Sequence, residues 1–225
     1  MAFLQTSIKT LRYGFTLIEL ITVVTVIAVV LSLLMPVMEQ VRRKINNTLC
    51  RHQLRQWGIA TQLYVTHHDG YLPSEGNPNP GPNTTRSGWY ELLPHEIGLP
   101  GYHLMPWRTN ASVKPGRTLW LCPDNTRRSN GRNLFHYCLN QYVNGTGKES
   151  QPTRLFSIAH PARVVWLFDS KNLPAVGRWT FMHTNLHGGG AQIVFLDAHV
   201  ERVKNPPAEN GVVRVDTPAE LIWIP

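Results

Sequence analysis

The sequence GFTLIELITVVTVIAVVLSLLM, residues 14–35, decides how this chain is organised. From residue 15 to residue 35 the only ionisable side chain is that of Glu19. An apolar helix of about 20 residues is long enough to cross the hydrocarbon core of a bilayer, which is roughly 30 Å thick. The stretch therefore predicts one membrane-spanning helix near the N-terminus.

Glu19 is an unusual residue for such a helix. An ionised side chain in a spanning helix costs about 2.5–3.5 kcal/mol even on permissive insertion scales, so acidic residues there usually have a partner. The segment also differs from a cleaved secretory signal, because MPVME at residues 35–39 follows the apolar run where a small-residue cleavage site would stand. We therefore expect the apolar run to stay on the protein and Glu19 to have a cationic partner.

The run GFTLIEL, residues 14–20, resembles the processing site of type IV prepilins and pseudopilins. The resemblance implies that prepilin peptidase cuts between Gly14 and Phe15 and methylates the new amine of Phe15. It also implies that Glu19 pairs with the Phe15 amine of a neighbouring subunit during assembly. Two charges that are each costly in lipid are less costly together, so this pair would set the axial register between subunits.

The same resemblance implies a location and a set of partners. The chain is expected in the bacterial inner membrane as a single-pass protein, with a cytoplasmic N-terminus and an extracytoplasmic globular domain. The charges flanking the span do not decide this orientation, because Lys9 and Arg12 on one side face residues 42–44 (RRK) on the other. Expected partners are prepilin peptidase, other pilin-like subunits, an inner-membrane assembly platform and membrane lipid. The implied role is a structural subunit of a type IV pilus-like or type II secretion-like pseudopilus filament, not an enzyme.

Hydrophobic periodicity predicts that the helix continues beyond the membrane. Apolar side chains recur every four residues from Val37 to Leu49, and a stripe with one slip continues to Tyr64. We expect this stripe to carry the core of the globular domain. The predicted organisation is a leader (1–14), a transmembrane and assembly helix (15–36) and a globular domain (37–225) with a helix to about residue 66, loops over 67–115 and a β-sheet over 117–225.

The second half of the chain is typical of short strands separated by turns. The residues HHDG at 67–70 are expected to end the helix, and aromatic residues within 89–115 are expected to fix an irregular loop to the body of the domain. Strands are predicted over 118–122, 163–168, 191–196, 199–203, 212–215 and 221–224, with a hairpin turn at 196–199. A long helix followed by strands predicts an α+β, pilin-like fold in which a small antiparallel sheet covers one side of the helix.

Charge and motifs exclude several function classes. The formal net charge is +8, but the basic residues form no stripe interleaved with aromatics, so no nucleic-acid partner is expected. The sequence HGGG at 187–190 is similar to the oxyanion loop of esterases, yet the chain has no G-x-S-x-G nucleophile motif. Neither G-x-G-x-x-G nor a P-loop motif is present. No cofactor is expected.

One histidine-rich segment supports an alternative function. His183, His187, Asp197 and His199 lie close together in sequence and are residue types that bind metals. The alternative is therefore a membrane-anchored, extracytoplasmic metal-binding or catalytic domain that uses this cluster, with Asp169 as a further candidate ligand and a divalent cation bound there. The favoured interpretation is structural, with imidazole and carboxylate groups hydrogen-bonded to turn backbone.

A second resemblance covers most of the globular domain. His187, nine intervening residues and Asp197 are similar to the H-x9-D-G segment near the end of many pilin-like proteins of planctomycete and verrucomicrobial bacteria, although Ala198 replaces the turn glycine. The segments CRHQLRQWGIA at 50–60 and LCPD at 121–124 agree with the same pattern. The three cysteines by themselves permit any pairing. The resemblance favours a Cys50–Cys122 disulfide that ties the helix to the sheet.

Overall fold

The computed structural model describes residues 14–77, 87–116, 118–128, 133–144, 151–171, 174–204, 208–209, 212–213 and 221–223. Contacts between residues divide the chain into two units, Met1–Arg42 and Arg43–Pro225. The leader up to residue 13, and the predicted strand residues 214–215 and 224, lie outside the described residues.

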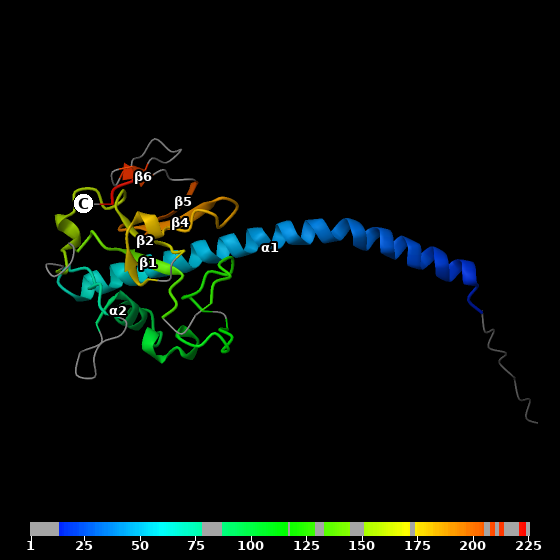
Figure 1. The fold of residues 1–225 in the computed structure, drawn as a ribbon, viewed down its shortest axis with the longest axis horizontal. Coiled ribbons are helices and arrows are strands. Elements are labelled where there is room, and N and C mark those ends of the chain that lie inside the picture. Colours follow the sequence, from blue (N-terminus) through cyan, green and yellow to red (C-terminus); the bar gives the residue numbers. More distant parts are fainter. Residues whose placement is uncertain are drawn as a thin grey trace, which may run out of the picture. The chain divides into compact units, whose positions relative to one another are not determined.

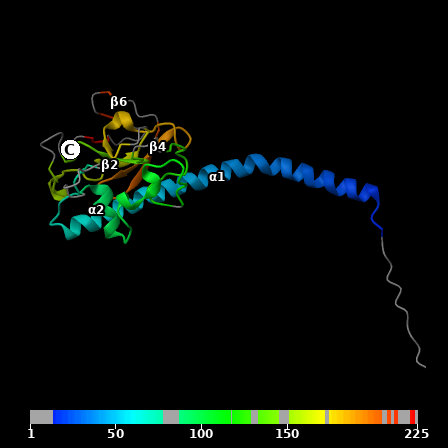
Figure 2. The ribbon, with the colours of Figure 1, turned by 60° about the horizontal axis from the view of Figure 1, so that its bottom comes forward.

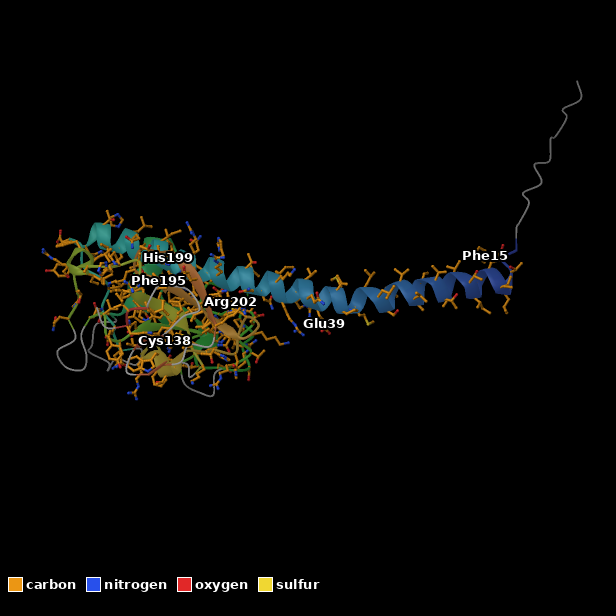
Figure 3. All side chains as sticks on the ribbon, turned by 90° about the horizontal axis from the view of Figure 1, so that it is seen from above. Phe15, Glu39, Cys138, Phe195, His199 and Arg202 are labelled. Carbon is orange, nitrogen blue, oxygen red and sulfur yellow. A yellow bond between two sulfur atoms is a disulfide. The ribbon has the colours of Figure 1, made fainter. Side chains whose placement is uncertain are left out.

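Helix α1 (Leu17–His67) continues without interruption through Pro36. By length and composition it is the one helix in the described part of the chain that could cross a membrane, and none of its apolar window is buried. Every large apolar side chain from Phe15 to Leu49 is exposed, and Figure 3 shows these side chains projecting on all sides of the helix. In water this surface is unfavourable, because each exposed CH₂ group forgoes about 0.8 kcal/mol of burial.

The globular unit is built on a five-stranded sheet with the order β3-β1-β2-β4-β5. Its strands are β1 (Tyr137–Asn140), β2 (Val165–Asp169), β3 (Val176–Gly177), β4 (Gly190–Phe195) and β5 (Val200–Lys204). A separate two-stranded ribbon pairs β6 (Ala208–Glu209) with β7 (Val212–Val213). The fold is therefore α+β, as predicted.

The sheet is mixed, which differs from the antiparallel prediction. β1–β2, β2–β4 and β4–β5 are antiparallel, whereas β1 and β3 are parallel. The reason is the path of the chain: β3 follows β2 in sequence, reverses direction and lies on the far edge of β1, so it runs the same way as β1. The hairpin between β4 and β5 turns at the predicted residues, and Ala198 has a positive φ of 70° there.

The last third of α1 packs against this sheet, as Figures 1 and 2 show. Its buried residues are Cys50, Leu54, Trp57, Gly58, Ala60 and Thr61. A Cβ on Gly58 would lie 2.8 Å from the Cβ of Ala198, so the glycine allows α1 to approach the β4–β5 turn. The prediction that the stripe from Val37 onward carries the core is wrong for its first half, because the side chains of α1 are fully buried only from Cys50 onward.

Both faces of the sheet are buried. Side chains alternate between faces along β4, where Val194 joins the core that faces α1 while Ile193 joins a second cluster. This second cluster also contains Phe168 and Trp223, whose rings meet edge to face. The prediction that the sheet covers one side of the helix concerns the α1 face, and the second cluster was not predicted.

The region before the sheet is held by aromatic residues, as predicted. Trp89, Tyr90, Tyr102 and Trp107 are all buried. The short helix α2 (Trp89–Glu96), which was not predicted, places Trp89 edge to face against Trp57 of α1 with ring centroids 5.9 Å apart. Single 3₁₀ turns lie at Tyr102–Leu104, Pro106–Arg108, Leu155–Ser157 and Trp179–Phe181.

One predicted strand, residues 118–122, is a turn. Side chains of α1 bind the backbone there: Gln53 Nε2 donates to the Thr118 carbonyl and Trp57 Nε1 donates to the Leu119 carbonyl. These carbonyls are therefore satisfied by the helix instead of by a neighbouring strand. Residues 221–222 form only bridges, with Ile222 beside Val164.

Candidate functional site

The start of α1 and the interior around His187 each combine polar groups with an apolar setting. At the start of α1, the backbone N–H and the hydroxyl of Thr16 both donate to Glu19 Oε2, at 2.9 and 2.7 Å. The Glu19 N–H donates back to Thr16 Oγ1 at 3.3 Å. This reciprocal arrangement is a capping box, which satisfies N–H groups that a helix otherwise leaves without partners.

Gly14 and Phe15, which precede the capping box, contact little of the described fold. A Cβ on Gly14 would meet no atom within 4 Å among the described residues. Phe15 is also exposed, with 77% of its surface accessible. The described fold therefore does not require a glycine at position 14.

The second place is the turn that leads into β4. His187, Gly188 and Gly189 have consecutive positive φ angles of 52°, 74° and 90°. The N–H groups of Gly189 and Gly190 both donate to the Leu186 carbonyl. These N–H groups close the turn, so they are not presented to a substrate as an oxyanion hole requires.

The turn places the His187 ring between two carboxylates. Nδ1 lies 2.9 Å from Asp124 Oδ2, and Nε2 lies 3.0 Å from Asp169 Oδ2. Asp169 Oδ2 also accepts the Gln192 N–H at 2.7 Å. Because carboxylates accept hydrogen bonds, an imidazolium ring, which donates from both nitrogens, fits this arrangement.

Electrostatics in this interior favour the charged ring. Burial acts to lower the pKa of His187, but the hydrogen bonds and charges of Asp169 and Asp124 outweigh burial, and the pKa is raised. Burial lowers the pKa of the neighbouring His183. It also lowers the pKa of His136 to about 4.

A cavity of about 500 Å³ opens beside the same turn. It is lined by Arg43, Lys44, Asn47, Asp124, Asn185, Leu186, His187, Gly188 and Arg202. Arg202 Nη2 donates to the Gly188 carbonyl at 2.8 Å and so holds the turn against β5.

The predicted histidine cluster is divided between the two ends of β4. His187 precedes the strand, whereas Asp197 and His199 follow it, and six residues of strand separate these ends by about 20 Å. Asp197 Oδ1 accepts the His199 N–H and also contacts His199 Nδ1, which is the turn-stabilising role expected for it. His183 belongs to the His187 end, because its N–H donates to the Asp169 carbonyl.

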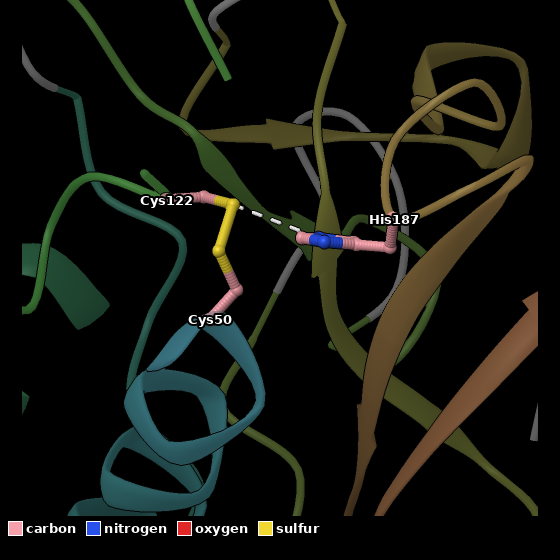
Figure 4. A group of neighbouring side chains, drawn as sticks. All are labelled: Cys50, Cys122 and His187. Carbon is pink, nitrogen blue, oxygen red and sulfur yellow. Dashed lines mark hydrogen bonds between the residues drawn. A yellow bond between two sulfur atoms is a disulfide. The ribbon is translucent and has the colours of Figure 1, made fainter. Parts of the chain in front are cut away.

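The two cysteines favoured by the second resemblance are paired in the structure. Cys50 and Cys122 form a disulfide, which links α1 to the turn at 118–122. Cys122 Sγ lies 3.6 Å from His187 Nε2, so the disulfide and the imidazole share one interior site (Figure 4). Cys138 is a buried free thiol.

Sequence reasoning missed the capping role of Thr16 and the contacts of Asp124 and Asp169 with His187, although it included Asp124 in the second resemblance and Asp169 as a further candidate ligand. The capping role of Thr16 is visible in the spacing T-x-x-E at residues 16–19. Asp124 and Asp169 carry no comparable pattern, because they are 45 residues apart and meet His187 only through the sheet topology.

Comparison with protein-family models, with curated proteins and with solved structures finds no match for this chain.

Proposed function

We propose that this chain is a structural subunit of a pilin-like filament, anchored in the bacterial inner membrane and matured by cleavage between Gly14 and Phe15. The observation that carries the proposal is the run GFTLIEL at residues 14–20, which leads into and begins an apolar helix whose side chains are exposed on every side. An apolar surface of this kind needs lipid before assembly and other apolar helices after it.

Exposure beyond the predicted membrane segment supports the same role. Val37, Val41, Ile45 and Leu49 continue the apolar surface of α1 toward the globular unit, and each is at least 40% exposed. Contiguous exposed apolar surface marks an interaction site. In the proposed filament, helices of neighbouring subunits cover it.

Glu19 is the register contact in this proposal. Both hydrogen bonds from Thr16 end on Oε2, which leaves Oε1 available, within the described residues, for a second partner. The Phe15 amine of a neighbouring subunit is the cation that cleavage creates at the same membrane depth. Further partners are prepilin peptidase and an inner-membrane assembly platform of a pilus or type II secretion system, and the globular domain lies outside the cytoplasm.

The alternative metal-binding or catalytic function loses its main support. It requires His187, Asp197 and His199 to act together, and β4 separates them. In the part of the chain that the structure describes, Asp197 and His199 bond to each other in a half-exposed turn.

Processing by a prepilin peptidase tests the proposal. Full-length protein co-expressed with such an enzyme is expected to shorten to residues 15–225, as followed by intact mass. Gly14→Ala should slow the cut moderately and Gly14→Phe should block it, since the peptidase site must accept residue 14. A side chain at position 14 would meet no described atom, so a loss of processing in these variants reports on the peptidase and not on a damaged fold. Equal processing of Gly14→Phe and the wild type would overturn the proposal.

A further inference from the structure

Three metal-binding residue types converge in the interior of the globular unit. Cys50 comes from α1, Cys122 from the turn after residue 118, and His187 from the turn before β4, as Figure 4 shows. The two sulfur atoms and a ring nitrogen of His187 all lie within 4.8 Å of one another. All three residues are buried, so few waters compete for a cation placed there.

As a disulfide, the two sulfurs cannot act as thiolate ligands, because the thiolate is the form that binds metals. Reduction changes this. A tetrahedral Zn²⁺ with Zn–S bonds of about 2.3 Å places two sulfurs about 3.8 Å apart, and places a sulfur and a nitrogen about 3.5 Å apart. Cys122 Sγ already lies 3.6 Å from His187 Nε2, which matches the tetrahedral sulfur–nitrogen spacing, and reduction allows the two bonded sulfurs to separate.

The surroundings of His187 are those of a metal-binding imidazole. A metal-ligating histidine almost always donates its other ring N–H to a carboxylate or carbonyl, which fixes the ring. His187 Nδ1 does this with Asp124 Oδ2 at 2.9 Å, so Nε2 is the atom that faces the cysteines.

A carboxylate lies beside Nε2. Asp169 Oδ2 lies 3.0 Å from it, and the Asp169 side chain is fully buried. Its other oxygen, Oδ1, has no hydrogen-bond partner among the described residues. A buried carboxylate oxygen without a partner is costly, and coordination to a cation removes that cost.

We propose that the dithiol form of this chain binds one Zn²⁺ through Cys50, Cys122 and His187, with the Asp169 carboxylate as fourth donor. Disulfide formation and zinc binding then exclude each other. The proposal adds a redox-dependent metal site to the globular unit and does not depend on the filament role, so either can fail without the other.

The chemistry balances as follows. A thiol reductant breaks the S–S bond, gives two electrons and two protons to Cys50 and Cys122, and is itself oxidised to a disulfide. Zn²⁺ binding then displaces the two thiol protons and the Nε2 proton of His187. Oxidation of the zinc-free thiols by a disulfide-bearing oxidant reverses the first step.

Zinc stoichiometry tests the proposal. Full-length chain in detergent, reduced with a phosphine and kept anaerobic, is incubated with Zn²⁺, separated from free metal and analysed for zinc. About one Zn²⁺ per chain is expected in the reduced form and none in the disulfide form. With Co²⁺ as a spectroscopic probe, thiolate-to-metal absorption is expected only for the reduced form.

Variants assign the ligands. Cys50→Ser, Cys122→Ser and His187→Gln should abolish stoichiometric binding, whereas Asp124→Asn should weaken it by about 10–100-fold. Cys138→Ser and His199→Ala are matched controls outside the cluster and should bind as the wild type does.

A second measurement uses only the wild-type chain, so its result does not depend on whether a variant folds. Zn²⁺ should protect Cys50 and Cys122, but not Cys138, from alkylation of the reduced chain, as mapped by mass spectrometry. The proposal is overturned if the reduced chain takes up no zinc, if the disulfide form binds equally, or if Cys138 is the protected thiol.

Discussion

His187 Nε2 lies 3.0 Å from Asp169 Oδ2, and neither side chain is exposed to solvent. A second pair, His199 and Asp197 at the other end of β4, has the same chemistry, but each side chain is 36% exposed. The chain therefore contains a buried and an exposed version of one contact.

This contrast gives the first prediction. Asp169→Asn should lower the free energy of unfolding by about 3–5 kcal/mol, because it removes the fully buried one of the two carboxylates that contact the His187 ring. Asp197→Asn should cost less than about 1 kcal/mol, because water screens an exposed pair. Urea unfolding of the full-length chain in detergent, followed by tryptophan fluorescence, measures both. Equal losses for the two variants would show that burial does not govern the His187 contact.

The disulfide gives the second prediction. Cys50 and Cys122 are 72 residues apart, and in the chain-entropy model closing such a loop stabilises the fold by about 4 kcal/mol. In zinc-free buffer, Cys50→Ser should lose roughly this amount in the same assay, and reduced wild type should match it. Cys138→Ser is the control, because Cys138 is equally buried but closes no loop. A loss for Cys138→Ser as large as that for Cys50→Ser would contradict the assignment.

The β4–β5 turn gives the third prediction. Ala198 has φ of 70°, a conformation that costs a residue with a Cβ about 1–2 kcal/mol relative to glycine. Ala198→Gly should therefore raise the free energy of unfolding, by about 0.5–1 kcal/mol after the greater chain entropy of glycine is subtracted. Asp69, with φ of 50°, is the control: aspartate tolerates this conformation, so Asp69→Gly should gain less. A destabilised Ala198→Gly variant would mean that its methyl contact with α1 outweighs backbone strain.

The fourth prediction concerns Glu19, which caps α1 and, in the proposed filament, pairs with the Phe15 amine. Two substitutions separate these roles. Glu19→Gln keeps a side chain that can cap the helix but removes the charge. Thr16→Ala keeps the charge but removes the hydroxyl bonded to Glu19, at a cost of about 1 kcal/mol in helix stability. If the charge sets the register, Glu19→Gln should be cleaved normally and enter filaments at least tenfold less, while Thr16→Ala should assemble. Cross-linking in native membranes measures incorporation, and the reverse pattern would assign Glu19 to capping alone.

The sequence predicts those parts of the molecule that local pattern determines. The membrane-length helix, its end at HHDG, the strands β2, β4 and β5 and the turn at Ala198 all follow from periodicity and turn residues. Strand β1 was missed, and so was β3, because two residues such as Val176 and Gly177 carry no periodicity. The segment 118–122 has strand-like composition, but its carbonyls at Thr118 and Leu119 accept hydrogen bonds from Gln53 and Trp57 of α1 and not from a neighbouring strand.

The interior site was predictable only in part. His187 was singled out by its sequence context, but it was grouped with Asp197 and His199, which the strand carries to the opposite end. Its actual partners, Asp124 and Asp169, are distant in sequence and lie beside it because of how the turn after residue 118 and the end of β2 pack around it. Tertiary topology, not spacing along the chain, determines this site.

The mass of the N-terminal peptide, measured on the protein isolated from its native membrane, shows whether the chain is cleaved before Phe15. The filament account predicts a peptide that begins at Phe15 and carries one methyl group on its α-amine. A peptide that begins at Met1 would leave Glu19 without the amine that the account requires, and would contradict it.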